Sequence, residues 1–210
     1  MDRYKTTFET WDKVAFAYQD KFMALDLYND TYNTFCQLVE KENAAVFEIG
    51  CGPGNITRYL LTQRPDFKIT AIDVAPAMVA LARENNPEAA FAVMDCREIS
   101  TLNREFDAIM CGFCMPYLSK EDCAKLLQDC AVLLNPGGIF YFSVIEGNYQ
   151  NSGYETSSSG LQMYVYYHQE DYLRESLQAN DFELVDLIRK MYPQSDAATS
   201  THLIFIVRKK

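Results

Sequence analysis

The distribution of apolar residues divides the chain into two unlike parts. In residues 10–42 the apolar positions recur at helical spacing, which predicts two helices with a break near Asn29 and Asp30. From residue 45 onward, short apolar runs of strand length alternate with amphipathic segments of helix length. This alternation is typical of βαβ units and predicts a doubly wound α/β fold, with a mostly parallel sheet and helices on both faces.

The boundaries of the predicted elements follow from this alternation. Strands are predicted at residues 45–49, 68–72, 90–94, 106–111 and 139–145, and helices at residues 55–63, 76–85 and 120–134. Pro76 suits the first turn of its helix, and the sequence Asn-Pro-Gly-Gly at 135–138 is a strong stop signal for the last one.

The C-terminal part departs from this rhythm. Residues 147–160 are rich in Ser, Asn, Gly and Tyr and are expected to form a mobile loop, followed by a β-like run at 163–167 and a helix at 169–180. Two further runs, at 182–188 and 202–207, are joined by a polar segment at 193–200 and predict an antiparallel hairpin at the sheet edge. The expected sheet therefore has seven strands.

Three glycines, Gly50, Gly52 and Gly54, follow the first predicted strand in the stretch VFEIGCGPGN. In a doubly wound sheet, ligands bind at the carboxyl ends of the strands near the first crossover, so this turn is a candidate binding site. A dinucleotide-binding turn requires G-x-G-x-x-G, but here the third glycine comes one residue early and Asn55 takes its place. No Lys-Ser/Thr pair follows, so the turn does not fit a phosphate-binding P-loop either.

The stretch E-I-G-C-G-P-G resembles motif I of the class I S-adenosylmethionine-dependent methyltransferases, and further elements follow in the order of that family. Asp73 ends the second strand, Asp95 lies in VMDCRE after the third, FDAIMCGFCMPYL resembles the fourth-strand motif, and LNPGGIFYFS resembles the turn into the fifth strand. The resemblance covers roughly residues 45–145. It implies a Rossmann-like methyltransferase fold, S-adenosyl-L-methionine as the cofactor, and methyl transfer to a small-molecule acceptor.

The resemblance also implies roles for three acids. Asp73 matches the acid that binds the ribose hydroxyls, and Asp95 matches the acid that accepts from the adenine amino group; capping of the following helix is the structural alternative for both. Glu48 matches an acid that supports the site and the amino-acid end of the cofactor, with a plain buried acid as the alternative. The expected cofactor-binding residues are Tyr18, Glu48, Gly50, Cys51, Gly52, Asn55, Asp73, Val74, Met78, Asp95, Cys96, Arg97 and Cys111.

One domain spanning residues 1–210 is expected, in four parts. They are an N-terminal helical lid (1–43), a cofactor-binding core (44–146), a substrate-binding insertion (147–168), and a C-terminal helix with edge strands (169–210). The opening helix resembles the lid helix of small-molecule members of the family, although an amphipathic helix that buries its aromatic residues in the core would look the same. The expected substrate-binding residues are Trp11, Tyr149, Tyr154, Tyr164 and Tyr166.

No catalytic residue follows from the sequence, because a general base is needed only for an acceptor that is protonated at neutral pH. His168 and Tyr117 are candidates, with a surface histidine that opens the next helix as the alternative for His168; His202 is expected to be structural. The acceptor, and whether its oxygen, nitrogen, carbon or sulfur is methylated, does not follow either.

The run Cys111-Gly-Phe-Cys114 also allows a redox site or half of a zinc site. Cys123 and Cys130 are seven residues apart on a predicted helix and do not form a second ligand pair, so no metal is expected. We expect this run to line the cofactor cleft instead.

The composition of the chain limits the classes of partner and the cellular location that are expected. A formal charge of −10 without a basic stripe disfavours nucleic acid. Seven cysteines and a polar start indicate reduced thiols in the cytoplasm, and the strand-length apolar runs leave no membrane span. A monomer or homodimer is expected. Two alternatives to a methyltransferase function remain. One is a nucleotide-dependent oxidoreductase, which the misplaced third glycine disfavours, and the other is a non-catalytic protein that binds S-adenosylmethionine.

Overall fold

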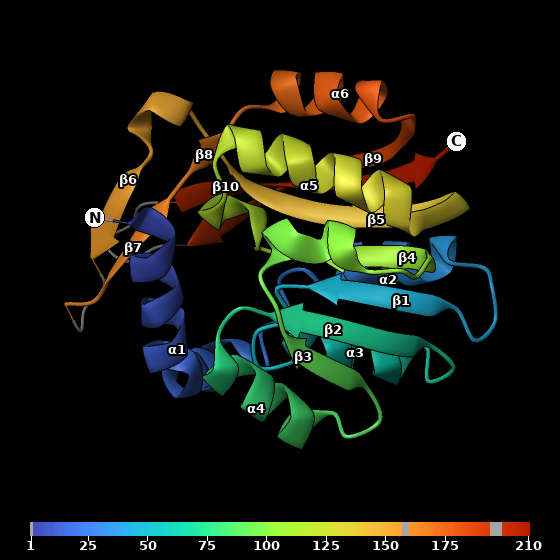
Figure 1. Cartoon of the computed structure of the whole chain (residues 1–210), viewed down its shortest axis with the longest axis horizontal. Helices are drawn as coiled ribbons and strands as arrows, with labels where there is room; N and C mark the ends of the chain where they lie inside the picture. Colours follow the sequence, from blue (N-terminus) through green and yellow to red (C-terminus); the bar gives the residue numbers. More distant parts are fainter. Residues whose placement is uncertain (1, 157–159, 194–198) are drawn as a thin grey trace.

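The computed structural model describes residues 2–156, 160–193 and 199–210, and its centre is a single mixed sheet (Figure 1). The helices are α1 (Arg3–Phe22), α2 (Asn29–Leu38), α3 (Asn55–Gln63), α4 (Pro76–Asn85), α5 (Lys120–Leu133) and α6 (Glu170–Ala179), with short 3₁₀ turns η1 (Cys96–Thr101), η2 (Met115–Tyr117) and η3 (Tyr149–Asn151). The strands are β1 (Ala45–Ile49), β2 (Lys68–Asp73), β3 (Ala90–Val93), β4 (Phe106–Cys111), β5 (Leu134–Glu146), β6 (Gly153–Thr156), β7 (Gln162–Val165), β8 (Tyr167–His168), β9 (Phe182–Pro193) and β10 (Thr199–Lys209).

The strand order confirms the predicted doubly wound topology. Seven strands follow the path β3-β2-β1-β4-β5-β10-β9, and the two-residue β8 pairs with the end of β5. Strands β1 to β5 are parallel, whereas β10 runs antiparallel to β5 and β9, so the C-terminal hairpin is also confirmed. Because β2 and β4 flank β1 on opposite sides, the chain reverses its direction of winding there and leaves a crevice at the carboxyl ends of β1 and β4.

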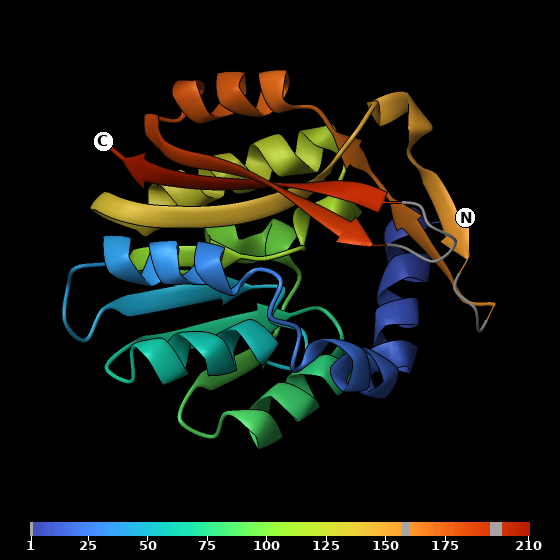
Figure 2. The ribbon, with the colours of Figure 1, turned by 180° about the vertical axis from the view of Figure 1, so that it is seen from behind.

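Helices cover both faces of the sheet, as the alternation of strands and helices predicts. Helix α5 lies over the face seen in Figure 1, and α2 and α3 lie over the opposite face in Figure 2. Successive residues of a strand point to opposite faces: Ile109 belongs to the core under α5, and Met110 belongs to the core under α2. This double burial explains why the strands appear in the sequence as continuous apolar runs.

The N-terminal helix is longer than predicted. It begins at Arg3 rather than near residue 10, because Asp2 caps it by accepting from the backbone N–H groups of Tyr4 and Lys5. The break was predicted near Asn29 and Asp30, but it comes earlier, and Asn29 is the first residue of α2. Helix α1 lies across the carboxyl ends of the parallel strands (Figure 1).

The expectation of a mobile loop at 147–160 is wrong for half of its length. Its described residues include η3 and β6, and β6 pairs with β7 in a hairpin. The hairpin lies against α1, where Thr10 Oγ1 donates to the carbonyl of Gln162 (2.6 Å) and the Tyr164 N–H donates to Thr7 Oγ1 (3.0 Å). Residues 157–159 of the predicted loop, and 194–198 of the polar segment between β9 and β10, lie outside the described residues.

Strand β5 also begins earlier than predicted, at Leu134 rather than Ile139. A register shift in β4 between Phe106 and Ala108 lets Leu134 pair with Phe106, so the Asn-Pro-Gly-Gly segment falls inside the strand. The helix still ends before this segment, as its sequence predicts. No helix among the described residues combines the length and the apolar character needed to cross a bilayer.

Candidate functional site

The glycine turn after β1 has a backbone that other residues rarely adopt. Gly50, Gly52 and Gly54 have φ values of 71°, 53° and 82°. A Cβ on Gly50 would lie 2.8 Å from the Cβ of Cys114, and one on Gly54 would lie 2.3 Å from Nδ2 of Asn86, whereas one on Gly52 would meet nothing closer than 3.6 Å. Two of the glycines therefore allow the turn to pack against the protein itself, and Gly52 leaves its backbone open to the crevice.

Asp73, at the end of β2, binds this turn directly. Its Oδ2 accepts from the N–H of Gly52 and its Oδ1 from the N–H of Ala75, both at 2.9 Å. Ala75 is the N-cap residue of α4, and the carboxylate that accepts from the first turn of that helix is Asp12, from the N–H of Ala77 at 2.7 Å, so Asp73 does not cap the helix. Burial raises the pKa of the Asp73 carboxyl, while the N–H groups of Ala75, Gly52 and Val74 oppose the increase.

The carboxylate of Asp95, which follows β3, forms a salt bridge with Arg97. Its Oδ1 accepts from the backbone N–H of Arg97, and the guanidinium binds both carboxylate oxygens, with Nη2 at 2.5 Å from Oδ2. The same guanidinium lies over the rings of Tyr4 and Phe8, at 4.0 and 5.6 Å from their centroids. Asp95 caps η1, so the structural alternative accounts for this acid, and little of its accepting capacity remains for a ligand.

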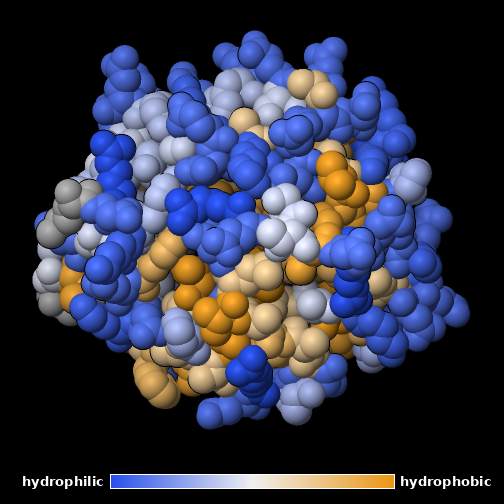
Figure 3. Space-filling model, in the orientation of Figure 1, coloured by the Kyte–Doolittle hydropathy of each residue, from blue (hydrophilic) through white to orange (hydrophobic). Residues whose placement is uncertain are grey.

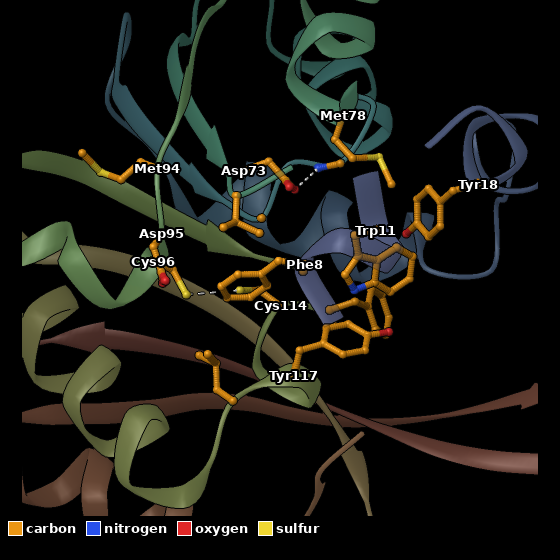
Figure 4. A pocket seen from close by; sticks show the side chains of 16 residues that line it. Phe8, Trp11, Tyr18, Asp73, Met78, Met94, Asp95, Cys96, Cys114 and Tyr117 are labelled. Atoms are coloured by element: carbon orange, nitrogen blue, oxygen red, sulfur yellow. Dashed lines mark hydrogen bonds between the residues drawn. The ribbon is translucent and has the colours of Figure 1, made fainter. Parts of the chain in front are cut away.

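These elements surround a cleft that is open on one side and measures about 730 Å³ when the open space at its mouth is included. Figure 4 shows side chains from α1, from the strand ends and from η2 converging on it, and Figure 3 shows apolar side chains gathered over α4 and β3 on the face seen in Figure 1. The lining residues are Phe8, Trp11, Tyr18, Gly50, Gly52, Asp73, Val74, Met78, Met94, Asp95, Cys96, Gly112, Phe113, Cys114, Tyr117 and Leu118.

Most of the residues predicted to bind the cofactor line this cleft, and five do not. Asn55 lies beside Gly52, with its Oδ1 3.9 Å from the position that a Cβ on Gly52 would take. Arg97 does not line the cleft itself but binds Asp95, which does. Cys51 and Cys111 are buried in the two cores. Glu48 is fully buried in β1 and does not reach the cleft surface.

Glu48 has an unusual environment. Its Oε2 accepts from the Thr57 hydroxyl at 2.5 Å, while Oε1 has no hydrogen-bond partner among the described residues. Burial raises the pKa of this carboxyl to about 8, against the opposing effect of Thr57, and the neighbouring Asp73 adds to the increase. The acid is therefore largely protonated at neutral pH.

The tyrosines predicted to bind the substrate lie outside the cleft. Tyr154 and Tyr164 pack against each other in the β6–β7 hairpin, with ring centroids 5.1 Å apart, and the guanidinium of Arg3 lies over the Tyr164 ring at 4.6 Å. Tyr149 stacks on the buried Tyr166. Tyr154 and Tyr164 lie in the hairpin that holds the start of α1, and Tyr149 and Tyr166 lie on either side of it, whereas Trp11 from the same prediction does line the cleft.

Both histidines are structural in this arrangement. His168 is fully buried, contrary to the alternative of a surface residue, and its ring nitrogens contact the Tyr172 hydroxyl and the Met115 carbonyl. His202 hydrogen-bonds the Tyr28 hydroxyl at 2.6 Å. Burial lowers the pKa of each imidazole to about 4, so both are neutral at pH 7, and His168 does not line the cleft as a base would.

Sequence reasoning missed three lining residues, Phe8, Met94 and Leu118, whereas Gly112, Phe113 and Cys114 belong to the run that was expected to line the cleft. Phe8 shares the helical face of Trp11 three residues later, but the helix start was placed too late to include it. In the Cys111–Cys114 run it is Cys114, not Cys111, that reaches the cleft, because Phe113 between them has a positive φ of 60°. Among the described residues, no cluster of three potential metal ligands occurs.

Comparison with known proteins places this site in context. Residues 46–138 match a family model described as a methyltransferase domain. Malonyl-[acyl-carrier protein] O-methyltransferase from Acetivibrio thermocellus is 30% identical over 131 residues, which cover 61% of this chain and 44% of that protein. Trans-aconitate 2-methyltransferase from Methylobacterium radiotolerans is 37% identical over 92 residues, which cover 44% of this chain and 34% of that protein.

The chain thus spans less than half the length of either curated relative. Among solved structures, 1,6-didemethyltoxoflavin-N1-methyltransferase from Burkholderia thailandensis, with bound 1,6-didemethyltoxoflavin and S-adenosylhomocysteine, has a TM-score of 0.72 at 22% identity. The similarity covers 98% of this chain and 88% of that one and confirms the predicted fold.

Proposed function

We propose that this chain, which belongs to the class I S-adenosylmethionine-dependent methyltransferases, transfers a methyl group from S-adenosylmethionine to a small-molecule acceptor. The observation that carries the proposal is Asp73, whose carboxylate lies in the cleft and accepts from the N–H of Gly52 in the glycine turn. A carboxylate and an open glycine backbone at adjacent strand ends suit a ribose next to an amino-acid tail.

The residues of the cleft fit this cofactor. Each oxygen of Asp73 already accepts one N–H and keeps a lone pair for one hydroxyl, so the carboxylate can hold both hydroxyls of a ribose. Gly52 presents its backbone without a side chain. The adenine end would rest mainly on the apolar surfaces of Met94 and Leu118, because Arg97 occupies Asp95.

When bound, S-adenosylmethionine supplies a methyl group activated by its attachment to a positively charged sulfur. The residues of the chain itself orient the bound molecules and shield them from water. Trp11 and Tyr18 from α1 cover the cleft and exclude water, while Asp73 fixes the orientation of the ribose. The phenols of Tyr18 and Tyr117 have pKa values raised above their usual value, mainly by burial, so they act as neutral hydrogen-bonding groups and not as bases.

Calorimetric titration of the purified chain tests the cofactor. We expect saturable binding of S-adenosylmethionine and of S-adenosylhomocysteine, and none of NAD. Binding of NAD without either sulfur compound would instead support a nucleotide-dependent oxidoreductase.

Transfer itself is tested by incubating the chain with a cell extract and S-adenosylmethionine labelled in its methyl group. We expect the label in the small-molecule fraction. Label in protein or nucleic acid would contradict the proposed acceptor class, and cofactor binding without any transferred label would support a non-catalytic binding protein.

The remaining expectations belong to the same proposal. The charge of −10 supports the absence of a nucleic-acid partner, and seven unpaired cysteines support a reducing, cytoplasmic location. We propose a monomer or homodimer, which sedimentation of the purified chain would test.

A further inference from the structure

One end of the cleft is built from aromatic rings. Trp11 makes edge-to-face contacts with Tyr18 and Tyr117, at centroid distances of 5.4 and 5.1 Å and interplanar angles of 90° and 75°. Figure 4 shows these three side chains on the side of the cleft away from Asp95, with Asp73 between the two ends. Since the acids at the strand ends suit the nucleoside, the aromatic end is the space left for the acceptor.

This end offers polar groups, and all of them are uncharged. Within the described part of the chain, neither the hydroxyls of Tyr18 and Tyr117 nor the indole N–H of Trp11 has a hydrogen-bond partner. Two hydroxyls and one N–H are therefore available to orient an acceptor that carries a few neutral polar atoms.

The charges that act on this end are negative. The only charged side chains among the described lining residues are Asp73 and Asp95. Asp73 raises the pKa of Tyr18 after the larger effect of burial, and Glu155 contributes to the raised pKa of Tyr117 after burial and Tyr18. The aromatic end is therefore within reach of carboxylates on two sides.

No basic side chain offsets these acids. The basic residues of α1 are exposed, and Arg3 and Lys21 lie over the rings of Tyr164 and Phe22. Arg97, which directly follows the lining residues Asp95 and Cys96, is bound to Asp95. Residues 1, 157–159 and 194–198, outside the described part, contain no Lys, Arg or His in the sequence.

We propose that the acceptor is an uncharged, flat and largely apolar ring compound that lies in the cleft against Trp11, Tyr18 and Tyr117. This inference rests on the proposed function and specifies its substrate class. A carboxylate in this space would lose its hydration and would find no cation of the protein, only the sulfonium of the bound cofactor, and Asp73 would repel it. The chain thus differs in acceptor chemistry from its relative named for trans-aconitate, which is a tricarboxylate.

Two probes that differ only in charge test the inference. 2-Naphthol and 2-naphthoate carry a hydroxyl or a carboxylate on the same ring system, and each is titrated calorimetrically into the chain saturated with S-adenosylhomocysteine at pH 7.5. We expect 2-naphthol to bind at least about tenfold more tightly than 2-naphthoate, and trans-aconitate not to bind. Equal or tighter binding of either carboxylate, or no saturable binding of 2-naphthol, would overturn the inference.

A pair of variants locates the binding. Trp11→Leu removes one wall of the aromatic end and should weaken the binding of 2-naphthol at least about fivefold. Phe16→Leu, on the exposed side of the same helix, should leave the affinity for 2-naphthol unchanged. Equal effects of the two variants would contradict the assigned position, and the comparison of probes on the unmodified chain does not depend on either variant folding.

The proposed function and this inference can fail separately. S-adenosylhomocysteine binding without selectivity for 2-naphthol refutes only the acceptor class. If S-adenosylhomocysteine does not bind, the proposed function fails, and the same probes on the unloaded chain still show whether the aromatic end selects neutral rings. Trp11 is the only tryptophan of the chain, so its fluorescence reports cofactor loading from inside the cleft.

Discussion

Asp73 links the end of β2 to the glycine turn, which lies 21 residues earlier in the sequence. One of its carboxylate oxygens accepts from the N–H of Gly52 and the other from the N–H of Ala75. In Asp73→Asn, an amide NH₂ group replaces one carboxylate oxygen. This group faces a backbone N–H and can no longer accept a hydrogen bond from a ribose hydroxyl. We expect calorimetry to show S-adenosylhomocysteine binding weakened roughly 10- to 100-fold, the equivalent of about 1.5–3 kcal/mol.

The matched control for this variant is Asp66→Asn. Asp66 is paired with Arg64 away from the cleft, so its replacement should lower stability without changing affinity. Similar losses of affinity in both variants would mean that Asp73 acts through the fold and not through the ligand.

Glu48 gives the stability of the protein an unusual dependence on pH. Because folding raises its pKa from an ordinary 4.5 to about 8, the folded chain keeps a proton that the unfolded chain loses. The free energy of unfolding should therefore fall as pH rises from about 5 to about 8, by an amount on the order of a few kcal/mol.

Glu48→Gln removes this contribution while keeping an oxygen for the Thr57 hydroxyl. Urea unfolding of both proteins across this pH range should show a stability difference that shifts steadily in favour of the variant as pH rises. Parallel curves would show that Glu48 titrates normally.

At the scale of elements, α1 is held over the cleft by side chains near its start. The Tyr4 hydroxyl donates to Asp122 and accepts from the N–H of Ser119, both at the beginning of α5. Tyr4→Phe should cost about 1–3 kcal/mol of stability and accelerate hydrogen exchange in α1.

Tyr59→Phe is the control for this effect, since its hydroxyl binds Asn29 and Asn33 on α2 and not a residue of α1. It should lower stability as well, with faster exchange in α2 and not in α1. If both variants loosen α1 equally, the tether through Tyr4 is not what holds this helix.

Strands β8 and β10 each carry one of the two histidines, which are the only ones in the chain. Burial keeps both imidazoles neutral down to a pKa of about 4. Their C2–H proton resonances should therefore stay constant between pH 8 and 5.5 in NMR spectra of the folded protein. A resonance that shifts with a midpoint near the ordinary value of 6.5 would show an accessible histidine and restore His168 as a candidate base.

Local signals decided which elements could be predicted. Strand β1 ends at a glycine turn and α4 begins at Pro76, so their bounds were predicted from the sequence alone. A β-like run overlapping β7 was predicted, but its partner β6 was not, because the hairpin lies against α1 through contacts that are distant in sequence, including that of Thr10 with Gln162. Here tertiary contact outweighs a composition typical of loops.

At the scale of the whole molecule, the topology explains which site residues were predictable. Asp73 and Asp95 end neighbouring parallel strands, and such ends always meet at one edge of the sheet. The run Cys111–Cys114 was expected at the cleft, but the sequence does not signal the positive φ of Phe113, so it did not show which side chains of the run reach the cleft. The acceptor was expected among the C-terminal tyrosines, whereas the acceptor end proposed above lies at α1 and η2, which line the cleft.

The central claim is that the cleft between α1 and the strand ends binds S-adenosylmethionine through Asp73 and the glycine turn. A crystal structure of the chain with S-adenosylhomocysteine tests it most directly. The account predicts both ribose hydroxyls within hydrogen-bond distance of Asp73, the amino-acid end beside Gly52, and the sulfur facing Trp11, Tyr18 and Tyr117. A ligand bound elsewhere, or one whose ribose does not contact Asp73, would contradict it.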